Sequence, residues 1–303
     1  MASPDLSIVT GALSYSGKHI ARKLLAAGQR VKTITGHPNR PNPFGDKVEV
    51  APFSFEDPGG LTDTLRGAST LYNTYWIRFP MRGMTYERAA ENSKTLVRCA
   101  EEAGVQRIVH ISIVRPSKDA PYGYYRGKAE VEAAIQASSL SYAILRPTVL
   151  FGGEDILLNN IAWSLRRFPV FPIAGKGDYK IRPINVDDLA QLAVEQGQHA
   201  ENVILDAVGP ETYTFRELAR TIAQTIGAGT LFIPVPRLFM LLGARMIGLA
   251  VRDVLLTRDE INGLMDGLMS SDEPATGTTK ISDWLQQNWD LVGTVYASEL
   301  RRR

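Results

Sequence analysis

Residues 7–28 read SIVTGALSYSGKHIARKLLAAG, and this stretch decides the fold class. The first four residues have the apolar composition of a short buried strand. From residue 17 onward, Ile20, Leu24 and Leu25 share one face of an expected helix, and Gly28 provides the usual helix end. A strand, a turn and a helix are therefore expected in direct succession.

The turn, TGALSYSG, stands in the context of a phosphate-binding loop. Gly11 allows a tight turn, and Gly17 allows the helix to pack closely on the strand. Ser14 occupies the middle position of a Gly-x-x-Gly-x-x-Gly loop, where the backbone approaches a pyrophosphate. Serine is small, its hydroxyl could donate to a phosphate oxygen, and the helix N-terminus supplies amide donors. We expect a dinucleotide site; the alternative is a tight turn without a ligand.

The segment VKTITGHPNR (31–40) favours NADP over NAD. It contains no acid that could bind the ribose hydroxyls of NAD. Lys32, His37 and Arg40 instead offer positive charge to a 2′-phosphate, although Lys32 lies within the expected strand. NADP is thus the preferred cofactor, with NAD as the alternative.

Strands alternate with helices through about residue 150. The expected strands cover 7–10, 31–35, 48–53, 70–73, 107–113 and 141–145, and the expected helices cover 17–27, 60–66, 85–103 and 124–137. This alternation predicts an α/β fold of the Rossmann type, with a doubly wound parallel sheet. We expect residues 1–150 to form this NAD(P)-binding domain, with returns near 180–208. Residues 151–303 should form mainly a smaller, discontinuous C-terminal substrate lobe.

Composition excludes several classes of function. The formal net charge of +2 argues against a bulk nucleic-acid binder. The single cysteine, Cys99, rules out a disulfide within the chain and fits a reducing, cytoplasmic location. The four histidines are scattered, so no metal site is expected. No secretory signal segment opens the sequence.

The most apolar stretch runs from Leu231 to Leu256 and is interrupted by prolines and arginines, which makes it a poor membrane span. We expect a helix that covers a pocket or core, and a membrane-surface helix is the alternative. The C-terminal Arg301-Arg302-Arg303 is expected to be a solvated end rather than a binding patch.

Tyr124 and Lys128 stand four residues apart in YYRGK, within an expected helix. Positions i and i+4 share a helix face, so the two side chains should be neighbours. A nearby ammonium stabilises tyrosinate and lowers the pKa of the phenol. Such a phenol can exchange a proton with a substrate oxygen, and the lysine can bind a ribose hydroxyl. The alternative is an ordinary pair on a helix surface.

Five segments together resemble the short-chain dehydrogenase/reductase superfamily: VTGALSYSG, RIVHISIV, YYRGK, YAILRPTVLFG and INVDDLAQL. Their order matches the atypical, extended branch. That branch includes NAD(P)H-binding epimerase/dehydratase-like proteins, nitrogen-metabolite-regulator-like proteins and the NADPH-binding accessory subunit of respiratory complex I. The resemblance covers most of the chain.

The resemblance implies roles for individual residues. Tyr124 would be the general acid/base, Lys128 would tune it and bind the nicotinamide ribose, and Ser112 would be a third catalytic partner. The implied cofactor-binding residues are Gly11, Ser14, Tyr15, Ser16, Gly17, Gly36, His37, Arg40, Ser54, Phe55, Thr74, Tyr75, Lys128, Pro147 and Thr148. Asn92 matches a helix asparagine that braces the backbone of the fourth strand.

The chain departs from the family pattern at four places. Ser14 replaces a glycine, Gly36 stands where NADP-preferring relatives often have arginine, and Ser54 stands where many have aspartate. After Ser112 the usual second polar residue is replaced by Ile113, so the serine side chain is expected one step from the useful position. Thr74 or Thr148 could substitute for it.

Apolar side chains follow the fourth and sixth expected strands and should border a substrate cleft. The residues expected to contact substrate are Trp76, Phe79, Met84 and Phe151. Trp163 and Phe168 are expected to be core between the lobes. Of Asp187 and Asp188, one should cap the helix that follows.

These patterns predict an NAD(P)(H)-dependent oxidoreductase that acts on a moderately hydrophobic carbonyl, hydroxyl or activated alkene. An epimerase or dehydratase with tightly bound NAD(P) is one alternative. A non-catalytic NAD(P)H-binding redox sensor or accessory subunit is the other. The expected partner is a small-molecule substrate. Binding to nucleic acid and an integral membrane span are not expected, and a homodimer is possible.

Overall fold

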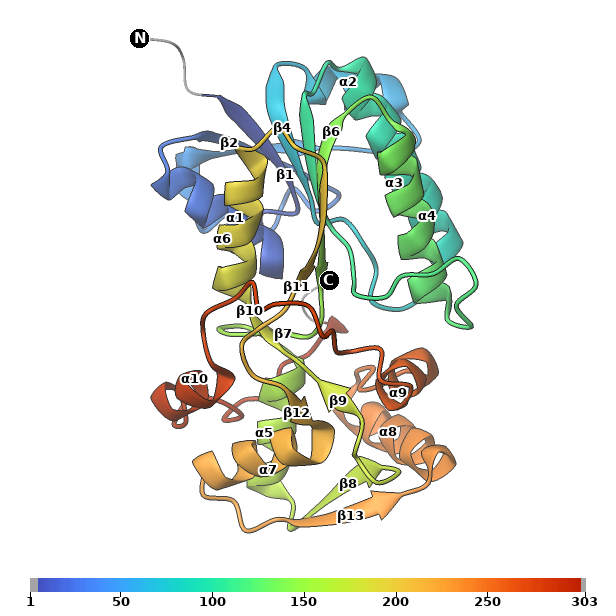
Figure 1. Ribbon diagram of the computed structural model, residues 1–303, viewed down its shortest axis with the longest axis vertical. Coiled ribbons are helices and arrows are strands. Elements are labelled where there is room, and N and C mark those ends of the chain that lie inside the picture. Colours follow the sequence, from blue (N-terminus) through green and yellow to red (C-terminus); the bar gives the residue numbers. More distant parts are fainter. Residues whose placement is uncertain (1–4, 301–303) are drawn as a thin grey trace. The chain divides into compact units, whose positions relative to one another are not determined.

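Seven strands form one sheet in the order β11-β6-β5-β4-β1-β2-β3 (Figure 1). They are β1 (Leu6–Thr10), β2 (Arg30–Thr35), β3 (Val48–Pro52), β4 (Ala68–Asn73), β5 (Arg107–Ile111), β6 (Ser141–Pro147) and β11 (Val203–Ala207). Each neighbouring pair from β6 to β3 is parallel. The order reverses at β1 and β4, and ligands of such sheets bind outside the carboxyl ends of the strands at this point. The predicted Rossmann-type sheet is confirmed in this computed structural model, which describes residues 5–300.

Helices cover both faces of the sheet. On one face α1 (Tyr15–Ala26) packs beside α6 (Val186–Gly197), and on the other lie α2 (Pro58–Leu65), α3 (Tyr86–Glu102) and α4 (Gly123–Ala137) (Figure 1). A short 3-10 turn, η1 (Gly45–Lys47), precedes β3. Buried strand and helix side chains form one cluster that includes Ile8, Ile34, Leu71, Ile108, Ile144, Leu96, Val131 and Ile135. The sequences of these strands are runs of mostly apolar residues because helices cover both faces of the sheet.

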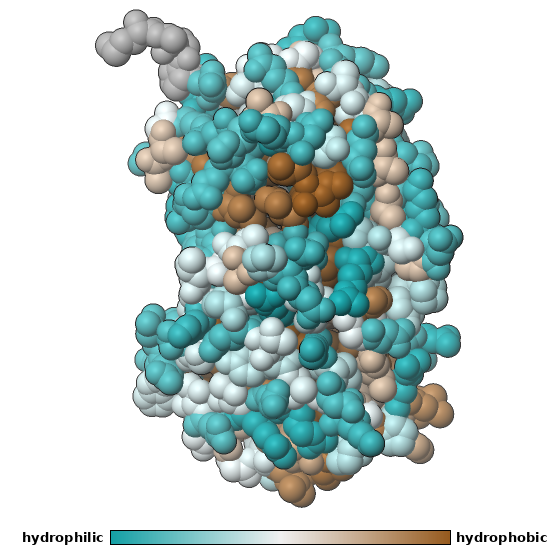
Figure 2. All heavy atoms as spheres, viewed as in Figure 1, coloured by the Kyte–Doolittle hydropathy of each residue, from teal (hydrophilic) through white to brown (hydrophobic). Residues whose placement is uncertain are grey.

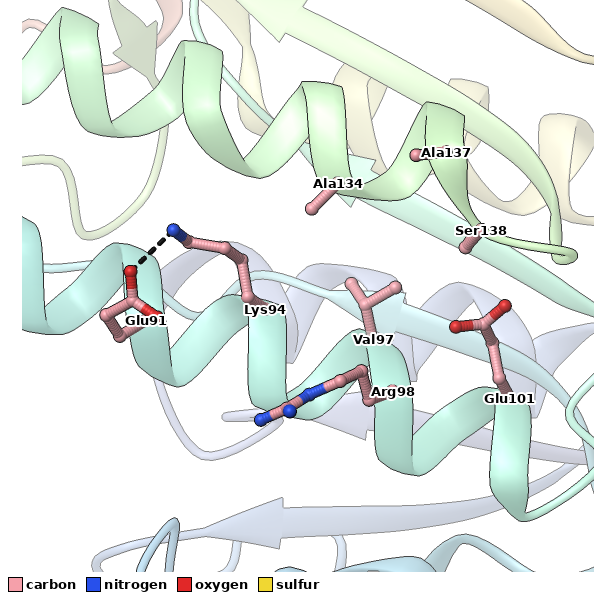
Figure 3. A pocket seen from close by; sticks show the side chains of 8 residues that line it. All are labelled: Glu91, Lys94, Val97, Arg98, Glu101, Ala134, Ala137 and Ser138. Carbon is pink, nitrogen blue, oxygen red and sulfur yellow. Dashed lines mark hydrogen bonds and ion pairs between the residues drawn. The ribbon is translucent and has the colours of Figure 1, made fainter.

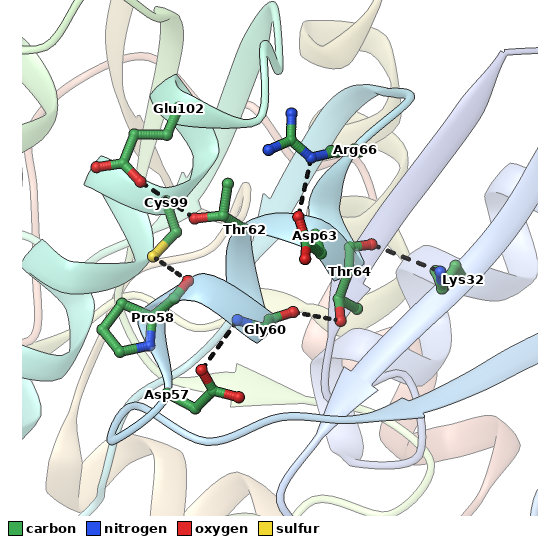
Figure 4. Close-up of polar contacts among 10 residues, drawn as sticks. All are labelled: Lys32, Asp57, Pro58, Gly60, Thr62, Asp63, Thr64, Arg66, Cys99 and Glu102. Carbon is green, nitrogen blue, oxygen red and sulfur yellow. Dashed lines mark hydrogen bonds and ion pairs between the residues drawn. The ribbon is translucent and has the colours of Figure 1, made fainter.

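Local sequence accounts for where α2 and α3 begin. The Asp57 carboxylate accepts a hydrogen bond from the Gly60 amide at 3.0 Å, and Pro58 fills the first turn of α2, where a missing N–H costs nothing (Figure 4). Thr85 caps α3 by accepting from the Arg88 amide at 3.2 Å. The buried Cys99 thiol of α3 donates to the Pro58 carbonyl at 3.4 Å and thereby links the two helices (Figure 4).

Two details of this part differ from the sequence-based expectation. The strand expected over 107–113 ends at Ile111, although Ser112 still donates its amide to the Leu145 carbonyl at 2.7 Å. Helix α6 begins at Val186, so Asp187 and Asp188 lie inside its first turn and not at the N-cap position expected for one of them. Asp187 instead lies 2.6 Å from the His19 imidazole and joins α6 to α1.

The chain divides into two compact units. The first joins the residues up to Pro147 with Val186–Asp206, and the second joins Thr148–Asn185 with the chain from Ala207 onward. The helices of the second unit are α5 (Leu157–Arg167), α7 (Phe215–Thr225), α8 (Arg237–Val251), α9 (Arg258–Met265) and α10 (Ile281–Gln287). Its short strands pair as β10 (Ile184–Asn185) with β7 (Leu150–Phe151), β12 (Tyr213–Thr214) with β9 (Lys180–Ile181), and β13 (Leu231–Val235) with β8 (Val170–Ala174).

A separate core holds the second unit together. It includes Phe151, Leu158, Ile161, Leu165, Leu218, Ile222 and Leu285. Trp163 is partly buried and packs edge-on against Tyr296, with ring centroids 5.2 Å apart. Phe168 was expected in a core, but 45% of it is exposed, so that expectation is wrong.

The apolar stretch 231–256 also differs from its expectation. It forms β13 and α8, but the large side chains of α8 are mostly exposed instead of covering a core. Within residues 5–300 no helix is both long enough and apolar enough to cross a bilayer. The predicted solvated end, Arg301-Arg302-Arg303, lies outside the described residues.

Candidate cofactor and active site

The loop between β1 and α1 depends on two glycines. Gly11 has a φ of +69°, which a residue with a side chain rarely adopts. A Cβ on Gly17 would lie 2.3 Å from the Gly11 carbonyl oxygen, so only glycine lets α1 approach the strand this closely. The Ser14 amide and hydroxyl both donate to that oxygen, at 2.9 Å and 2.6 Å. The Ser14 hydroxyl proton is thus used within the loop here, and its expected contact with a phosphate stays a prediction.

Three threonine hydroxyls hold the base of the loop. The Thr33 hydroxyl donates to the Val9 carbonyl and accepts from the Ala12 amide, both at 2.9 Å. The Thr74 amide donates to the Thr10 hydroxyl at 2.6 Å, and the Thr74 hydroxyl donates to the Thr10 carbonyl. The first amides of α1 cannot form hydrogen bonds within the helix, and these threonine contacts hold the loop that precedes them in place. Such an arrangement attracts an anionic group.

Two basic side chains follow β2. The Arg40 amide donates to the His37 carbonyl at 3.2 Å, so a turn brings the two residues together. Burial and the positive charge of Arg40 lower the pKa of His37 below its usual value. Nothing lies within 4 Å of where a Cβ on Gly36 would stand, so there is open space beside the pair. Lys32 is not part of this group, because its ammonium lies 3.0 Å from Glu49 and 3.5 Å from the Thr64 carbonyl (Figure 4).

The segments after β3 and β4 meet through aromatic rings. Phe55 lies 4.8 Å from Phe53 and 4.9 Å from Tyr75, measured between ring centroids. The Asn92 amide donates to the Tyr75 hydroxyl at 2.9 Å, so Asn92 fixes a side chain and not, as expected, the strand backbone. Burial raises the pKa of Tyr75. Ser54 forms the turn into α2, since its hydroxyl accepts from the Glu56 amide at 3.1 Å.

Lys128 lies inside the protein, beneath Trp76. It is 2% exposed, its ammonium donates to the Ile111 carbonyl at 2.7 Å, and that ammonium lies 4.8 Å from the centre of the Trp76 ring. Burial lowers the pKa of Lys128 to about 7, and the charge of Glu132 opposes this shift. The Tyr124 ring contacts the same indole edge-on at 5.8 Å. Tyr124 and Lys128 therefore share one neighbour, the Trp76 indole.

Ser112 belongs to a buried ionic network. Its hydroxyl donates to the Glu132 carboxylate at 2.5 Å, and that carboxylate also accepts from Arg146 Nε at 3.0 Å. Glu132 is 3% exposed. Sequence reasoning missed Glu132 and Arg146. One signal existed, because Glu132 stands four residues after Lys128 and so lies on the same helix face.

Several remaining predicted residues fall in different surroundings. Pro147 ends β6, and its carbonyl accepts from the Val114 amide at 3.1 Å. Thr148 belongs to the second unit and donates its hydroxyl to the Arg182 carbonyl. Phe151 is 0% exposed and packs on Trp284 in that unit's core, so its predicted contact with substrate is wrong.

Phe79 and Met84 lie in the segment after β4, which leads into α3. Phe79 is 4% exposed and has the Arg78 guanidinium 5.6 Å from the centre of its ring. The Met84 sulfur lies 4.0 Å from the Tyr75 hydroxyl and is only partly buried. Met84 therefore borders the aromatic group after β4, whereas Phe79 has a packing position.

A groove between α3 and α4 is lined by Glu91, Lys94, Val97, Arg98, Glu101, Ala134, Ala137 and Ser138 (Figure 3). Ion pairs occupy part of it, because the Lys94 ammonium lies 2.5 Å from Glu91 and 3.5 Å from Glu130. It belongs to the outer surface of the helix layer. The candidate site is instead the set of loops at the carboxyl ends of β1, β2, β3 and β4, together with the start of α4.

Comparisons with known proteins identify the family of the chain. A family model described as NAD(P)H-binding matches residues 11–162. The mitochondrial NADH dehydrogenase [ubiquinone] 1 alpha subcomplex subunit 9 of Arabidopsis thaliana is 23% identical over 76% of this chain and 60% of its own. A ceramide reductase of Caulobacter vibrioides is 24% identical over 75% of this chain and 73% of its own. The chain thus spans only about 60% of the first of these relatives.

Solved structures share the fold. Triphenylmethane reductase of Citrobacter sp., complexed with NADP(H), superposes with a TM-score of 0.78 at 19% identity, over 93% of this chain and 99% of its own. An NADPH-dependent quinone oxidoreductase of Escherichia coli, complexed with NADPH, gives 0.76 at 19% identity, over 93% and 99%.

The burial of Lys128 predicts a pH-dependent stability. Its pKa is lowered from 10.5 to about 7 in the folded chain, so between these values the unfolded chain holds a proton that the folded chain lacks. Stability from this group therefore rises with pH across that window, by about 1.4 kcal/mol per pH unit. In Lys128→Met this rise disappears, which urea unfolding at several pH values would measure. The exposed Lys118→Met serves as control, and equal pH slopes in the parent and Lys128→Met would contradict the assignment.

Proposed function

Because the chain belongs to the NAD(P)H-binding family, we propose that it is an NAD(P)(H)-dependent oxidoreductase of the short-chain dehydrogenase/reductase type. Its substrate would be a moderately hydrophobic carbonyl, hydroxyl or activated alkene. The observation that carries the proposal is the group formed by Trp76, Tyr124 and Lys128, in which a phenol and a buried ammonium contact one indole.

The residues present fit a dinucleotide. The Gly11–Gly17 loop has the close backbone packing that leaves helix amides available to a pyrophosphate. The buried Trp76 Nε1, beside Lys128, has no hydrogen-bond partner among the described residues, so one donor is available there. Proposed cofactor contacts are Gly11, Ser14, Tyr15, Ser16, Gly17, Gly36, His37, Arg40, Ser54, Phe55, Thr74, Tyr75 and Lys128, with Pro147 and Thr148 near the nicotinamide.

The pair of His37 and Arg40 supports NADP as the preferred cofactor. Both side chains follow β2, where a 2′-phosphate would lie, and residues 31–40 contain no acid for ribose hydroxyls. A phosphate there would favour protonated His37, whose pKa is lowered in its absence. Binding of NADPH is therefore proposed to raise the pKa of His37.

The proposed chemistry places proton transfer on Tyr124. When bound, the reduced dinucleotide supplies a hydride to the carbonyl carbon. The Tyr124 hydroxyl gives a proton to the carbonyl oxygen, and the resulting tyrosinate is stabilised by the Lys128 ammonium. In the opposite direction the same phenolate accepts the proton of the alcohol. Because the pKa of Lys128 is about 7, this support weakens above neutral pH.

Ser112 takes a different proposed role from the one its motif implies. To polarise a substrate, Ser112 would have to donate a hydrogen bond from its hydroxyl. In the structure this hydroxyl donates to the Glu132 carboxylate instead. We assign Ser112, Glu132 and Arg146 to positioning α4 against β5 and β6, and thereby to positioning Tyr124. Thr74 is also engaged, since its hydroxyl donates to the Thr10 carbonyl.

Apolar substrates are supported by the segment after β4, where Trp76 and Met84 are partly buried and Trp76 contacts the proposed acid, Tyr124. The names of three relatives or structural neighbours refer to reduction of a ceramide, a triphenylmethane dye and a quinone. Those names describe other proteins, but each compound is largely apolar. Small apolar carbonyl compounds and quinones are therefore the first substrates to screen.

One observation favours the non-catalytic alternative. Several relatives are subunits of mitochondrial NADH dehydrogenase, and in this chain the expected third catalytic hydroxyl is committed to Glu132. An accessory NAD(P)H-binding protein would need the loop and Arg40 but not Tyr124. The epimerase or dehydratase alternative is supported by solved sugar-nucleotide epimerases with the same fold. A cytoplasmic location and a homodimer stay predictions.

Cofactor selectivity tests the basic pair. Arg40→Ala should weaken NADPH binding about tenfold, the effect of losing one charge-assisted contact, and leave NADH binding unchanged. Lys32→Ala is the matched control, because the Lys32 ammonium contacts Glu49 and should leave both affinities unchanged. Equal affinity of the parent for NADPH and NADH in a fluorescence titration would remove the NADP assignment.

Turnover tests the catalytic assignment. Tyr124→Phe should lower kcat for NADPH-dependent reduction of quinones or enones by about a hundredfold or more, since the proton donor is lost. Tyr125→Phe, a buried neighbour on the same helix, should keep kcat within about threefold. NADPH affinity should be unchanged in both. Undiminished turnover by Tyr124→Phe would rule out the proposed mechanism.

A further inference from the structure

Helix α8 carries large apolar side chains on its solvent-facing side. Five of them are more than half exposed: Leu238 (64%), Phe239 (62%), Leu242 (52%), Met246 (68%) and Leu249 (69%). Positions 238, 242, 246 and 249 lie on one face of a helix with 3.6 residues per turn. We call these five residues the apolar face of α8.

The opposite side of α8 packs on its own unit, and the two buried residues described there, Ala244 and Gly248, are small. Ala244 is 9% exposed, and a Cβ on Gly248 would lie 2.6 Å from the Asp253 carbonyl oxygen. The buried Asp253 carboxylate fixes the end of the helix by accepting from the Tyr296 hydroxyl at 3.0 Å and the Glu299 amide at 2.8 Å. The apolar face is therefore held outward by close backbone packing beneath it.

The charged side chains of residues 231–252 are all positive. Arg237, Arg245 and Arg252 are exposed, and no Asp or Glu occurs from Leu231 through Arg252. The preceding strand, β13, also has exposed apolar side chains, Leu231 (63% exposed) and Ile233 (38%). Figure 2 shows hydrophobic residues protruding at the lower right, where Figure 1 places α8.

We propose that α8 docks on the surface of a bilayer that contains anionic lipid. Large exposed apolar patches on soluble proteins tend to be functional, and the apolar face of α8 gathers five such side chains on one helix. Apolar side chains that enter the acyl boundary, with arginines at headgroup level, are the features of an interfacial helix. At 15 residues α8 is shorter than a membrane span, which requires about 20.

Charge argues for this occupant over a second copy of the chain. A two-fold dimer through α8 would place the same patch on itself, and the three arginines of each copy would face arginines without a carboxylate from this segment. Anionic headgroups provide the missing negative charge. The inference is independent of the proposed oxidoreductase activity, since α8 and β13 belong to the second unit and the phosphate loop to the first.

Flotation of the full chain with lipid vesicles tests this proposal. The parent should float with vesicles of phosphatidylcholine and phosphatidylglycerol, float less with phosphatidylcholine alone, and be partly released by high salt. The double variant Leu242→Glu/Met246→Glu should reduce the bound fraction about tenfold. Leu291→Glu is the matched control, because Leu291 is 66% exposed in the same unit but outside α8. Each variant is first checked for unchanged circular dichroism and NADPH affinity.

Two outcomes would overturn the proposal. One is equal flotation of the parent and the Leu242→Glu/Met246→Glu variant, or no flotation of the parent. The other is that the parent does not bind vesicles and forms a dimer in analytical ultracentrifugation that Met246→Glu dissociates. In that case α8 would be a contact between copies of the chain. If the parent does not bind NADPH, the proposed function is wrong, but the vesicle result still tests the membrane proposal.

Discussion

The close backbone approach between Gly17 of α1 and the Gly11 carbonyl governs the geometry of the candidate site. A Cβ at position 17 would lie 2.3 Å from that oxygen, so any other residue would push the helix away from β1. The same oxygen accepts from the Ser14 amide and hydroxyl, which closes the loop. The helix N-terminus is thereby held at the carboxyl edge of the sheet, where its dipole favours an anion. Serine in place of the usual glycine strengthens the loop's own hydrogen bonding.

Burial of charge shapes the other half of the site. Burial removes water from the Lys128 ammonium. The Ile111 carbonyl, the face of the Trp76 indole and the charge of Glu132 partly offset the cost of this lost hydration. Glu132 in turn is neutralised by Arg146 and hydrogen-bonded by Ser112. Removing one member would leave another charge buried without a partner, which is costly. The network therefore couples the position of α4, which carries Tyr124, to two strands of the sheet.

Much of the first unit could be predicted from sequence, because its strands are apolar runs and its helices have clear faces and ends. The loop at 11–17 and the shared face of Tyr124 and Lys128 follow from spacing alone. The partner of Ser112 could not be predicted, since Glu132 and Arg146 come from separate elements that only the fold brings together. Apolar composition was misleading at α8 and at Phe151, because hydrophobicity alone does not say whether a side chain packs in a core, borders a ligand site or is exposed.

Amide hydrogen exchange with and without NADPH tests most directly the claim that the loops at the carboxyl ends of β1 to β4 form the cofactor site. Saturating NADPH should slow exchange in peptides that cover residues 11–17, 36–40 and 74–76, because bound cofactor would stabilise those loops. Exchange in peptides from the α3–α4 groove and from α8 should stay unchanged. Protection confined to the groove or to the second unit, with none at residues 11–17, would contradict the account.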